Sequence, residues 1–171
     1  MKNKSSFQKD YNDLAFVIDQ TNLIDANIKQ IITHYITPQK GKGKFVRDIV
    51  LNSSIVSLAD KIKVFFNICS NISYGINAKT RHKFFEIARI RNAFAHNYMF
   101  NPSSIKISEK QNGNIKFNID LVLEKVENSG QFETTTRIEA SKKFKENLKE
   151  VKKILNEVTI EILKHKIYPD S

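Results

Sequence analysis

Cysteine, glycine and proline are all scarce in this chain of 171 residues, which contains 1 Cys, 5 Gly and 3 Pro. A single cysteine excludes an internal disulfide and any zinc site that needs several thiolates. Because glycine and proline punctuate turns, their scarcity favours long helices over an all-β fold. The sequence has no apolar run of about 20 residues, the length that a membrane-spanning helix needs. Its N-terminus is polar and lacks the apolar core of a signal peptide. We therefore expect a cytoplasmic protein without membrane association.

Acidic residues are outnumbered by basic ones, 18 Asp and Glu against 28 Lys and Arg, which gives a net charge of +10 at pH 7. A positive surplus of this size attracts polyanions such as nucleic acids and raises their encounter rate. A Lys-rich protein without such a partner has the same charge, so both interpretations stay open. With 40% apolar and 27% charged residues, the composition is that of a globular protein, and we expect residues 1–171 to form a single domain.

Apolar residues recur at helical spacing along most of the chain and predict a mainly α-helical bundle. The first expected helix ends before Pro38, because the residue before a proline avoids the helical conformation. Ser57 is a suitable N-cap for a later helix with Asp60 in its first turn. Cys69 falls on the apolar face of that helix, so we expect a buried side chain rather than a reactive thiol. The expected helices cover residues of about 11–35, 45–52, 58–72, 80–96 and 139–166.

The last expected helix carries an apolar stripe whose members are four, three, four, three and four residues apart. They are Phe144, Leu148, Val151, Leu155, Val158 and Ile162. Such a seam near the heptad period fits either a coiled-coil dimer face or a helix packed inside its own bundle. We favour the bundle, because an amphipathic helix of a globular protein more often turns its apolar stripe towards its own core.

A basic segment, residues 37–44, separates the first two expected helices and contains Gly41 and Gly43. It is not a phosphate-binding P-loop, because no strand precedes it and it lacks the Gly-Lys-Ser or Gly-Lys-Thr ending. We expect a flexible, solvated connector, while a secondary contact with phosphates stays open.

The apolar pattern changes from helical to alternating within residues 104–137, as in β-strands. Alternation is clear in 104–108 and 115–119, and the Asn-Gly pair at 112–113 is a strong signal for a tight hairpin turn. The alternating pattern continues on both sides of a second turn, which we expect at residues 128–130. We therefore expect a small antiparallel β-hairpin or meander inserted into the helical bundle.

Arg91 stands out because it falls on an otherwise apolar stripe of its helix. A guanidinium there has to pair with an acid, extend to solvent, or line a pocket or an interface. His96 follows five residues later at the expected helix end, where the helix dipole stabilises a cationic side chain. Purely structural roles for Arg91 and His96 are therefore also compatible with the pattern.

Helix geometry restricts how these side chains can act together. Asn92 and His96 are four residues apart, so they share a helix face and can hydrogen-bond. Arg91 and His96 are separated by roughly 140° around the axis, at about 100° per residue, so they do not converge from one straight helix. Fraying of the helix end would bring them together, and so would a two-fold axis that places a second copy opposite the first.

Residues 91–96, Arg-Asn-Ala-Phe-Ala-His, resemble the RxxxxH signature of the HEPN superfamily, in which an arginine, a polar residue and a histidine take these positions. The longer run 87–96 and the upstream run 57–63 are similar to the mannitol operon repressor-like subgroup of that superfamily. The resemblance covers about residues 10–100 and a closing helix. The β insertion departs from the plain helical bundle of the family.

The resemblance implies a HEPN-like bundle that forms a homodimer, with two arginines and two histidines at one cleft. Many members are metal-independent endoribonucleases, often toxins or phage-defence effectors, so it implies RNA as substrate, catalytic roles for Arg91, Asn92 and His96, and an antitoxin or regulatory protein as a further partner. Other members have no nuclease activity, and for the repressor subgroup the resemblance leaves nuclease activity open. The alternatives are a non-catalytic HEPN-type regulator or binding protein and a plain helical interaction protein.

Metal-independent RNA cleavage is chemically consistent with these three residues. RNA carries its own nucleophile, the ribose 2′-hydroxyl, and a neutral His96 imidazole can take its proton near pH 7. The guanidinium of Arg91 matches phosphate geometry and can stabilise the charge that develops there, while Asn92 can orient His96 or the phosphate. No HExxH motif or dense Asp/Glu/His cluster indicates a metal, and we expect no cofactor. The remaining histidines are expected to be structural or solvated: His34, His82 and His165.

Overall fold

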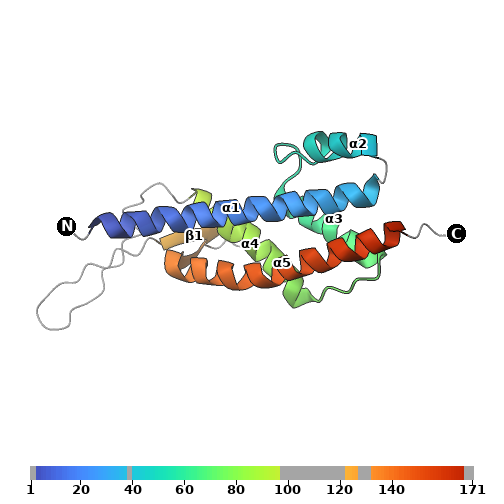
Figure 1. Cartoon of the computed structure of the whole chain (residues 1–171). Coiled ribbons are helices and arrows are strands. Elements are labelled where there is room, and N and C mark those ends of the chain that lie inside the picture. Colours follow the sequence, from blue (N-terminus) through green and yellow to red (C-terminus); the bar gives the residue numbers. More distant parts are fainter. Residues whose placement is uncertain (1–2, 38–39, 97–121, 127–131, 168–171) are drawn as a thin grey trace, which may run out of the picture. The chain divides into compact units, whose positions relative to one another are not determined.

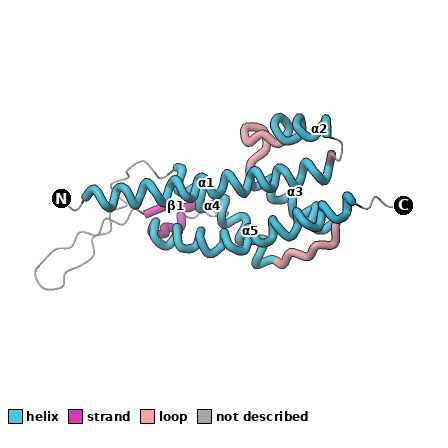
Figure 2. The backbone as a smooth tube through the Cα atoms, in the orientation of Figure 1, coloured by secondary structure: helices cyan, strands magenta, loops and turns pink. Residues whose placement is uncertain are grey.

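Helices make up most of the structure, a computed structural model that describes residues 3–37, 40–96, 122–126 and 132–167 (Figures 1 and 2). In chain order they are α1 (Asn3–Ile36), α2 (Lys40–Phe45), a π-helical turn η1 (Val46–Val50), α3 (Leu58–Asn71), α4 (Ala78–His96) and α5 (Arg137–Ile167). Two strands, β1 (Val122–Val126) and β2 (Phe132–Thr136), precede α5 and pair in antiparallel fashion. The predicted mainly helical bundle with a small antiparallel β element is confirmed.

The β insertion is described in its second half. Val126 of β1 pairs with Phe132 of β2, so the two strands flank the turn expected at 128–130. That turn itself, the strands expected at 104–108 and 115–119, and the Asn-Gly turn between them lie outside the described residues.

Contacts between residues divide the chain into two compact units. Unit 1 comprises residues 1–18 and 89–146, and unit 2 comprises residues 19–88 and 147–171. The three long helices α1, α4 and α5 each contribute residues to both units. The expected single domain over the whole chain stays a prediction.

Aromatic side chains from α3 and α4 form the centre of unit 2. Phe65 and Phe66 on α3 pack against Phe84 and Phe85 on α4, with ring centroids between 5.3 and 5.9 Å apart. Phe65 and Phe84 are fully buried, and burial of one such ring contributes about 1.5–3 kcal/mol to stability. This aromatic cluster fixes the first part of α4 against α3.

The apolar stripe of α5 is buried within the chain itself. All six members have at most 7% of their surface exposed: Phe144, Leu148, Val151, Leu155, Val158 and Ile162. A coiled-coil face would leave this stripe uncovered in a single copy. The predicted packing of the last helix inside its own bundle is therefore confirmed.

In unit 1, the start of α5 packs against α1. The rings of Phe16 and Phe144 meet edge to face with centroids 6.1 Å apart, and the Ser141 hydroxyl donates to Asp13 at 3.2 Å. A reciprocal capping pair begins α5: the Glu139 N–H donates to Thr136 Oγ1 at 3.2 Å, and the Thr136 N–H donates to Glu139 Oε2 at 3.1 Å. These bonds stabilise the boundary between strand β2 and helix α5.

The prediction of a flexible connector at 37–44 is wrong for residues 40–44, which belong to α2. The short helix expected at 45–52 thus begins at Lys40 and ends as the π-helical turn at Val50. A Cβ atom on Gly43 would lie 3.3 Å from Thr33 Cγ2 of α1, so the absence of a side chain permits this close approach. Tertiary contact has overridden the poor intrinsic helix propensity of glycine.

Candidate functional site

The candidate site lies on the last two turns of α4, within unit 1. α4 begins where Asn77 accepts a hydrogen bond from the Thr80 N–H at 2.8 Å, which caps the first turn. From there the helix is continuous through His96. The end of α4 is therefore an ordered α-helix in which the exposure of each side chain follows from its position around the axis.

One face of this helix end is buried and another is exposed. Ile90, Ala93 and Phe94 are buried, with 5%, 9% and 2% of their surface exposed. On the exposed face lie Asn92, Ala95 and His96, and Arg91 at its border is half-buried. Asn92 and His96 thus share an exposed face, as their spacing of four residues requires.

Asn92 contacts Arg91 rather than His96. The Arg91 Nη1 group donates to Asn92 Oδ1 at 3.2 Å, whereas no hydrogen bond joins Asn92 to His96 among the described contacts. A guanidinium has five N–H donors, and the remaining donors of Arg91 meet no acceptor among the residues that the structure describes. In this arrangement Asn92 positions the arginine, and the guanidinium can still offer donors to a phosphate.

Arg91 and His96 do not converge within one copy. Because α4 is helical through His96, the fraying that would bring the two side chains together is not observed. At about 100° per residue they project roughly 140° apart. Of the two arrangements considered from the sequence, a second copy of α4 opposite the first is the one compatible with this helix.

Other reactive side chains have ordinary surroundings. Cys69 is buried as predicted, and burial raises the pKa of its thiol to about 12. His82 is exposed and lies 3.8 Å from Glu86, and the His34 ring lies 3.5 Å from the Gln30 amide. The side chain of His165 is outside the described part of the chain.

Among the residues that the structure describes, no three His, Cys, Asp or Glu side chains come together as metal ligands. No helix in this part of the chain is long and apolar enough to cross a membrane.

No protein-family model matches the chain, and no curated protein or solved structure matches it either. The resemblance to HEPN proteins therefore depends on the sequence motif alone.

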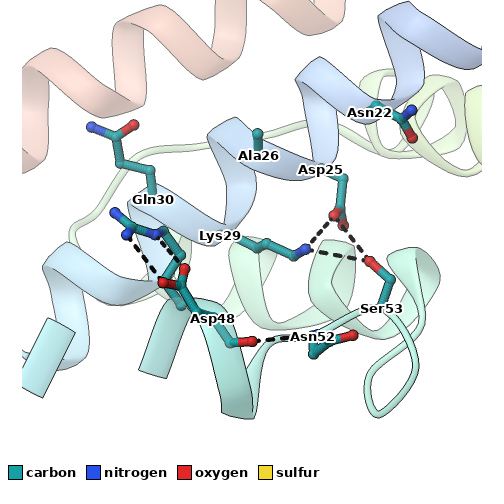
Figure 3. Close-up of a pocket in the computed structure, with 9 residues that line it drawn as sticks. Asn22, Asp25, Ala26, Lys29, Gln30, Asp48, Asn52 and Ser53 are labelled. Atoms are coloured by element: carbon teal, nitrogen blue, oxygen red, sulfur yellow. Dashed lines mark hydrogen bonds and ion pairs between the residues drawn. The ribbon is translucent and has the colours of Figure 1, made fainter. Parts of the chain in front are cut away.

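Unit 2 contains a second polar cluster, which was not predicted from the sequence. Lys61 of α3 is fully buried, and its ammonium donates to Asp25 Oδ1 at 2.8 Å and to Ser53 Oγ at 3.1 Å. Lys29 lies 2.8 Å from the other oxygen of Asp25 and donates to Ser53 at 3.3 Å (Figure 3). A signal was present, because Lys61 stands next to Ile62 on the apolar side of its helix, as unusual there as Arg91 is on α4.

Proposed function

We propose that this chain is a metal-independent endoribonuclease of the HEPN type, in which Arg91, Asn92 and His96 of two copies form the catalytic cleft. The observation that carries the proposal is the exposed face at the end of α4, where Asn92 and His96 lie together and Asn92 holds the half-buried Arg91. These are the three positions of the RxxxxH motif. A structural arginine on an apolar stripe would instead be expected to pair with an acid.

In the proposed reaction, the neutral His96 imidazole removes the proton of a ribose 2′-hydroxyl. The 2′-oxygen attacks the adjacent phosphorus, and the bond from phosphorus to the 5′-oxygen of the next nucleotide breaks. The leaving 5′-oxygen takes a proton from water, and the upstream fragment keeps a 2′,3′-cyclic phosphate. Arg91 donates to the phosphate oxygens, whose negative charge increases in the transition state.

The charge of the chain supports RNA as the substrate. A net charge of +10 attracts a polyanion irrespective of its sequence, so the basic surface supplies affinity while the α4 residues supply chemistry. We propose action in the cytoplasm, as a toxin or phage-defence effector under the control of an antitoxin or regulatory protein partner.

The proposal is tested by incubating the purified protein with mixed RNA in the presence of EDTA. We expect cleavage to persist, because the nucleophile and the base are supplied without a metal, and fragments with a cyclic phosphate or its hydrolysis product at the 3′ end. DNA lacks the 2′-hydroxyl and should stay intact. His96→Ala should lower the cleavage rate by ~10²–10⁴-fold, whereas His82→Ala, a change at an exposed histidine of the same helix, should leave it unchanged.

The competing proposal is a HEPN-type regulator that binds a partner through the same face without catalysis. The side chains of Arg91 and His96 point in different directions on the α4 helix of one copy. If the chain is a monomer in solution, this arrangement favours the regulator over the ribonuclease. RNA cleavage that disappears with EDTA, or that is equal in wild type and His96→Ala, would contradict the ribonuclease proposal. Binding without cleavage by the wild-type protein would favour the regulator.

A further inference from the structure

The segment formed by α2 and η1 has an apolar face that is exposed to solvent. Phe45, Ile49 and Val50 are 61%, 52% and 43% exposed. The Leu51 N–H donates to the Val46 carbonyl oxygen at 2.9 Å. This bond spans five residues, as in a π-helix, so side chains four and five positions apart lie on one side of the turn. The three exposed side chains therefore share one face, which we call the η1 apolar face.

Another side of the same segment holds it against the helices of unit 2. Gly43 lies close to Thr33 of α1, Val46 is half-buried, and Leu51 is 6% exposed. Figure 1 shows α2 beside the C-terminal part of α1. Because the segment has a buried side of its own, the η1 apolar face is not needed to pack it. Grouped apolar side chains that stay exposed beside polar residues are typical of interaction surfaces.

Cations outnumber anions on this segment. Among its described side chains, Lys42, Lys44 and Arg47 are cationic and Asp48 is anionic, so 3 − 1 leaves a charge of +2. Arg47 pairs with Asp48, with Nε 2.8 Å from Oδ1, whereas Lys42 and Lys44 are exposed on either side of the helix next to the apolar face. The neighbouring cluster around Asp25 contains two lysines, so it does not reverse this surplus.

An occupant of this surface has to account for both the apolar side chains and the cations. A second copy, related by a two-fold axis, would place its lysines against the same lysines, and like charges across an interface are unfavourable. A single-stranded RNA would stack a base on Phe45 and pair its phosphates with lysines, but Ile49 and Val50 offer no ring for stacking. Three side chains exposed by about half present less apolar surface than one myristoyl chain, which by itself gives only marginal membrane binding.

We propose that the η1 apolar face binds an acidic amphipathic segment of a partner protein. The apolar side chains of that segment cover Phe45, Ile49 and Val50, and its Asp and Glu side chains pair with Lys42 and Lys44. Aromatic side chains enclosed by a partner dominate binding energy at interfaces, while charges at the edge favour a partner of opposite sign. All five residues belong to unit 2, so the inference does not depend on the ribonuclease proposal for the α4 residues of unit 1.

The test is selection of binders to the full chain from a displayed library of random peptides. The selected peptides are then titrated, with a fluorescent label, against wild type and variants. We expect them to be acidic and to carry apolar side chains at helical spacing. Phe45→Ser should weaken their binding at least about tenfold, because it removes the aromatic anchor. The double variant Lys42→Glu, Lys44→Glu should weaken it too, and so should added salt in the wild type.

Two matched controls separate this face from general properties of the surface. Ile160→Ser removes an apolar side chain of α5 that is 54% exposed. Lys63→Glu reverses the charge of an exposed lysine of α3, which pairs with Asp60. Both variants should bind the selected peptides as wild type does. His96→Ala should bind them as well, so a failure of this proposal and a failure of the ribonuclease proposal are distinguishable.

Three outcomes would overturn the proposal: no selected peptide, selected peptides that are basic or lack apolar residues, or equal binding by Phe45→Ser and wild type. If no peptide is selected but phosphatidylserine vesicles or a single-stranded RNA bind through Phe45, the face belongs to a membrane or to RNA instead. A thermal melt of each variant shows whether it is folded. If Phe45→Ser is unfolded, Ile49→Ser decides the question, because that side chain is 52% exposed on the same face.

Discussion

At the scale of single residues, the two polar sites differ in how their cations are held. Arg91 is half-buried and is held by a neutral amide oxygen of Asn92. Lys61 is fully buried and is held by the carboxylate of Asp25. A cation bound by an amide keeps its charge available to an incoming anion, whereas a cation bound by a carboxylate is neutralised in place. Arg91 therefore meets a requirement of the proposed catalysis, whereas the Asp25–Lys61 pair contributes to stability.

Arg91→Lys is expected to lower RNA cleavage by at least about tenfold. An ammonium group cannot contact Asn92 Oδ1 and two phosphate oxygens in one plane, as a guanidinium can. The rate is measured on a short labelled RNA with EDTA present. Arg81→Lys, at an exposed arginine of the same helix, is the matched control and should keep wild-type activity. Equal activity of Arg91→Lys and wild type would show that Arg91 acts as a simple positive charge or not at all.

Asp25→Asn is expected to lower the free energy of unfolding by about 3 kcal/mol at neutral pH, because it leaves the Lys61 ammonium buried without a counter-ion. Denaturant unfolding measures the change. Lys164→Gln breaks an exposed ion pair with Glu161 and should cost at most about 0.5 kcal/mol. A similarly small effect of Asp25→Asn would show that Lys61 finds another partner when its carboxylate is removed.

The effect of Asp25 should also depend on pH. Burial raises the pKa of this carboxyl, but the hydrogen bonds from Lys29 and Lys61 outweigh burial and hold the pKa below 3.8. Because the folded pKa is depressed, the stabilisation is complete above pH 3.8 and is lost as the pH falls through the folded value. The difference in stability between wild type and Asp25→Asn should therefore shrink below pH 3.8.

At the scale of elements, the exposed face of α4 includes a small residue. Ala95 lies on this face with Asn92 and His96. Small side chains allow two helices to approach closely, and in a symmetric dimer the same patch of both copies meets at the axis. The composition of this face is thus compatible with direct contact between two copies of α4.

Ala95→Arg is expected to prevent dimer formation, because a long cation would be placed against its own copy across the two-fold axis. Sedimentation at micromolar concentration should show a dimer for wild type and a monomer for Ala95→Arg, and RNA cleavage should be lost together with the dimer. Ala78→Arg, an exposed alanine at the other end of α4, is the control and should stay dimeric and active. A monomeric wild type would count against the ribonuclease proposal itself.

At the scale of the whole molecule, the two copies are expected to share their catalytic residues. Because Arg91 and His96 diverge on one helix, each site would combine the arginine of one copy with the histidine of the other. Consider a mixed dimer in which one copy carries Arg91→Ala and the other carries His96→Ala. One of its two sites then has both the arginine and the histidine, and the other site has neither.

A one-to-one mixture of the Arg91→Ala and His96→Ala proteins should therefore regain activity, although each variant alone is inactive. With random exchange, half of the dimers are mixed and each has one intact site, so the recovery should be roughly one quarter of wild-type activity. Exchange of subunits is verified with two affinity tags. If mixed dimers form and remain inactive, the sites are not shared between copies.

The limits of most helices could be predicted from the sequence, because they depend on local chemistry. Pro38 stops α1 shortly before it, Ser57 caps α3 through its contact with the Asp60 N–H, and the apolar stripe of α5 is buried as its spacing indicated. The position of Arg91, Asn92 and His96 on α4 was equally local, since helix periodicity alone predicts which of them share a face.

Tertiary structure decided what depends on neighbours distant in the sequence. Residues 40–44 are helical with Gly43 close to Thr33, and Lys61 is buried with the carboxylate of Asp25, 36 residues earlier, as its counter-ion. The partner of Asn92 was also undetermined, since its spacing allowed a hydrogen bond with His96, whereas the structure shows one from Arg91. Side-chain partners and long-range ion pairs depend on which helices pack together, and local periodicity fixes the faces of a helix without identifying the residues that those faces meet.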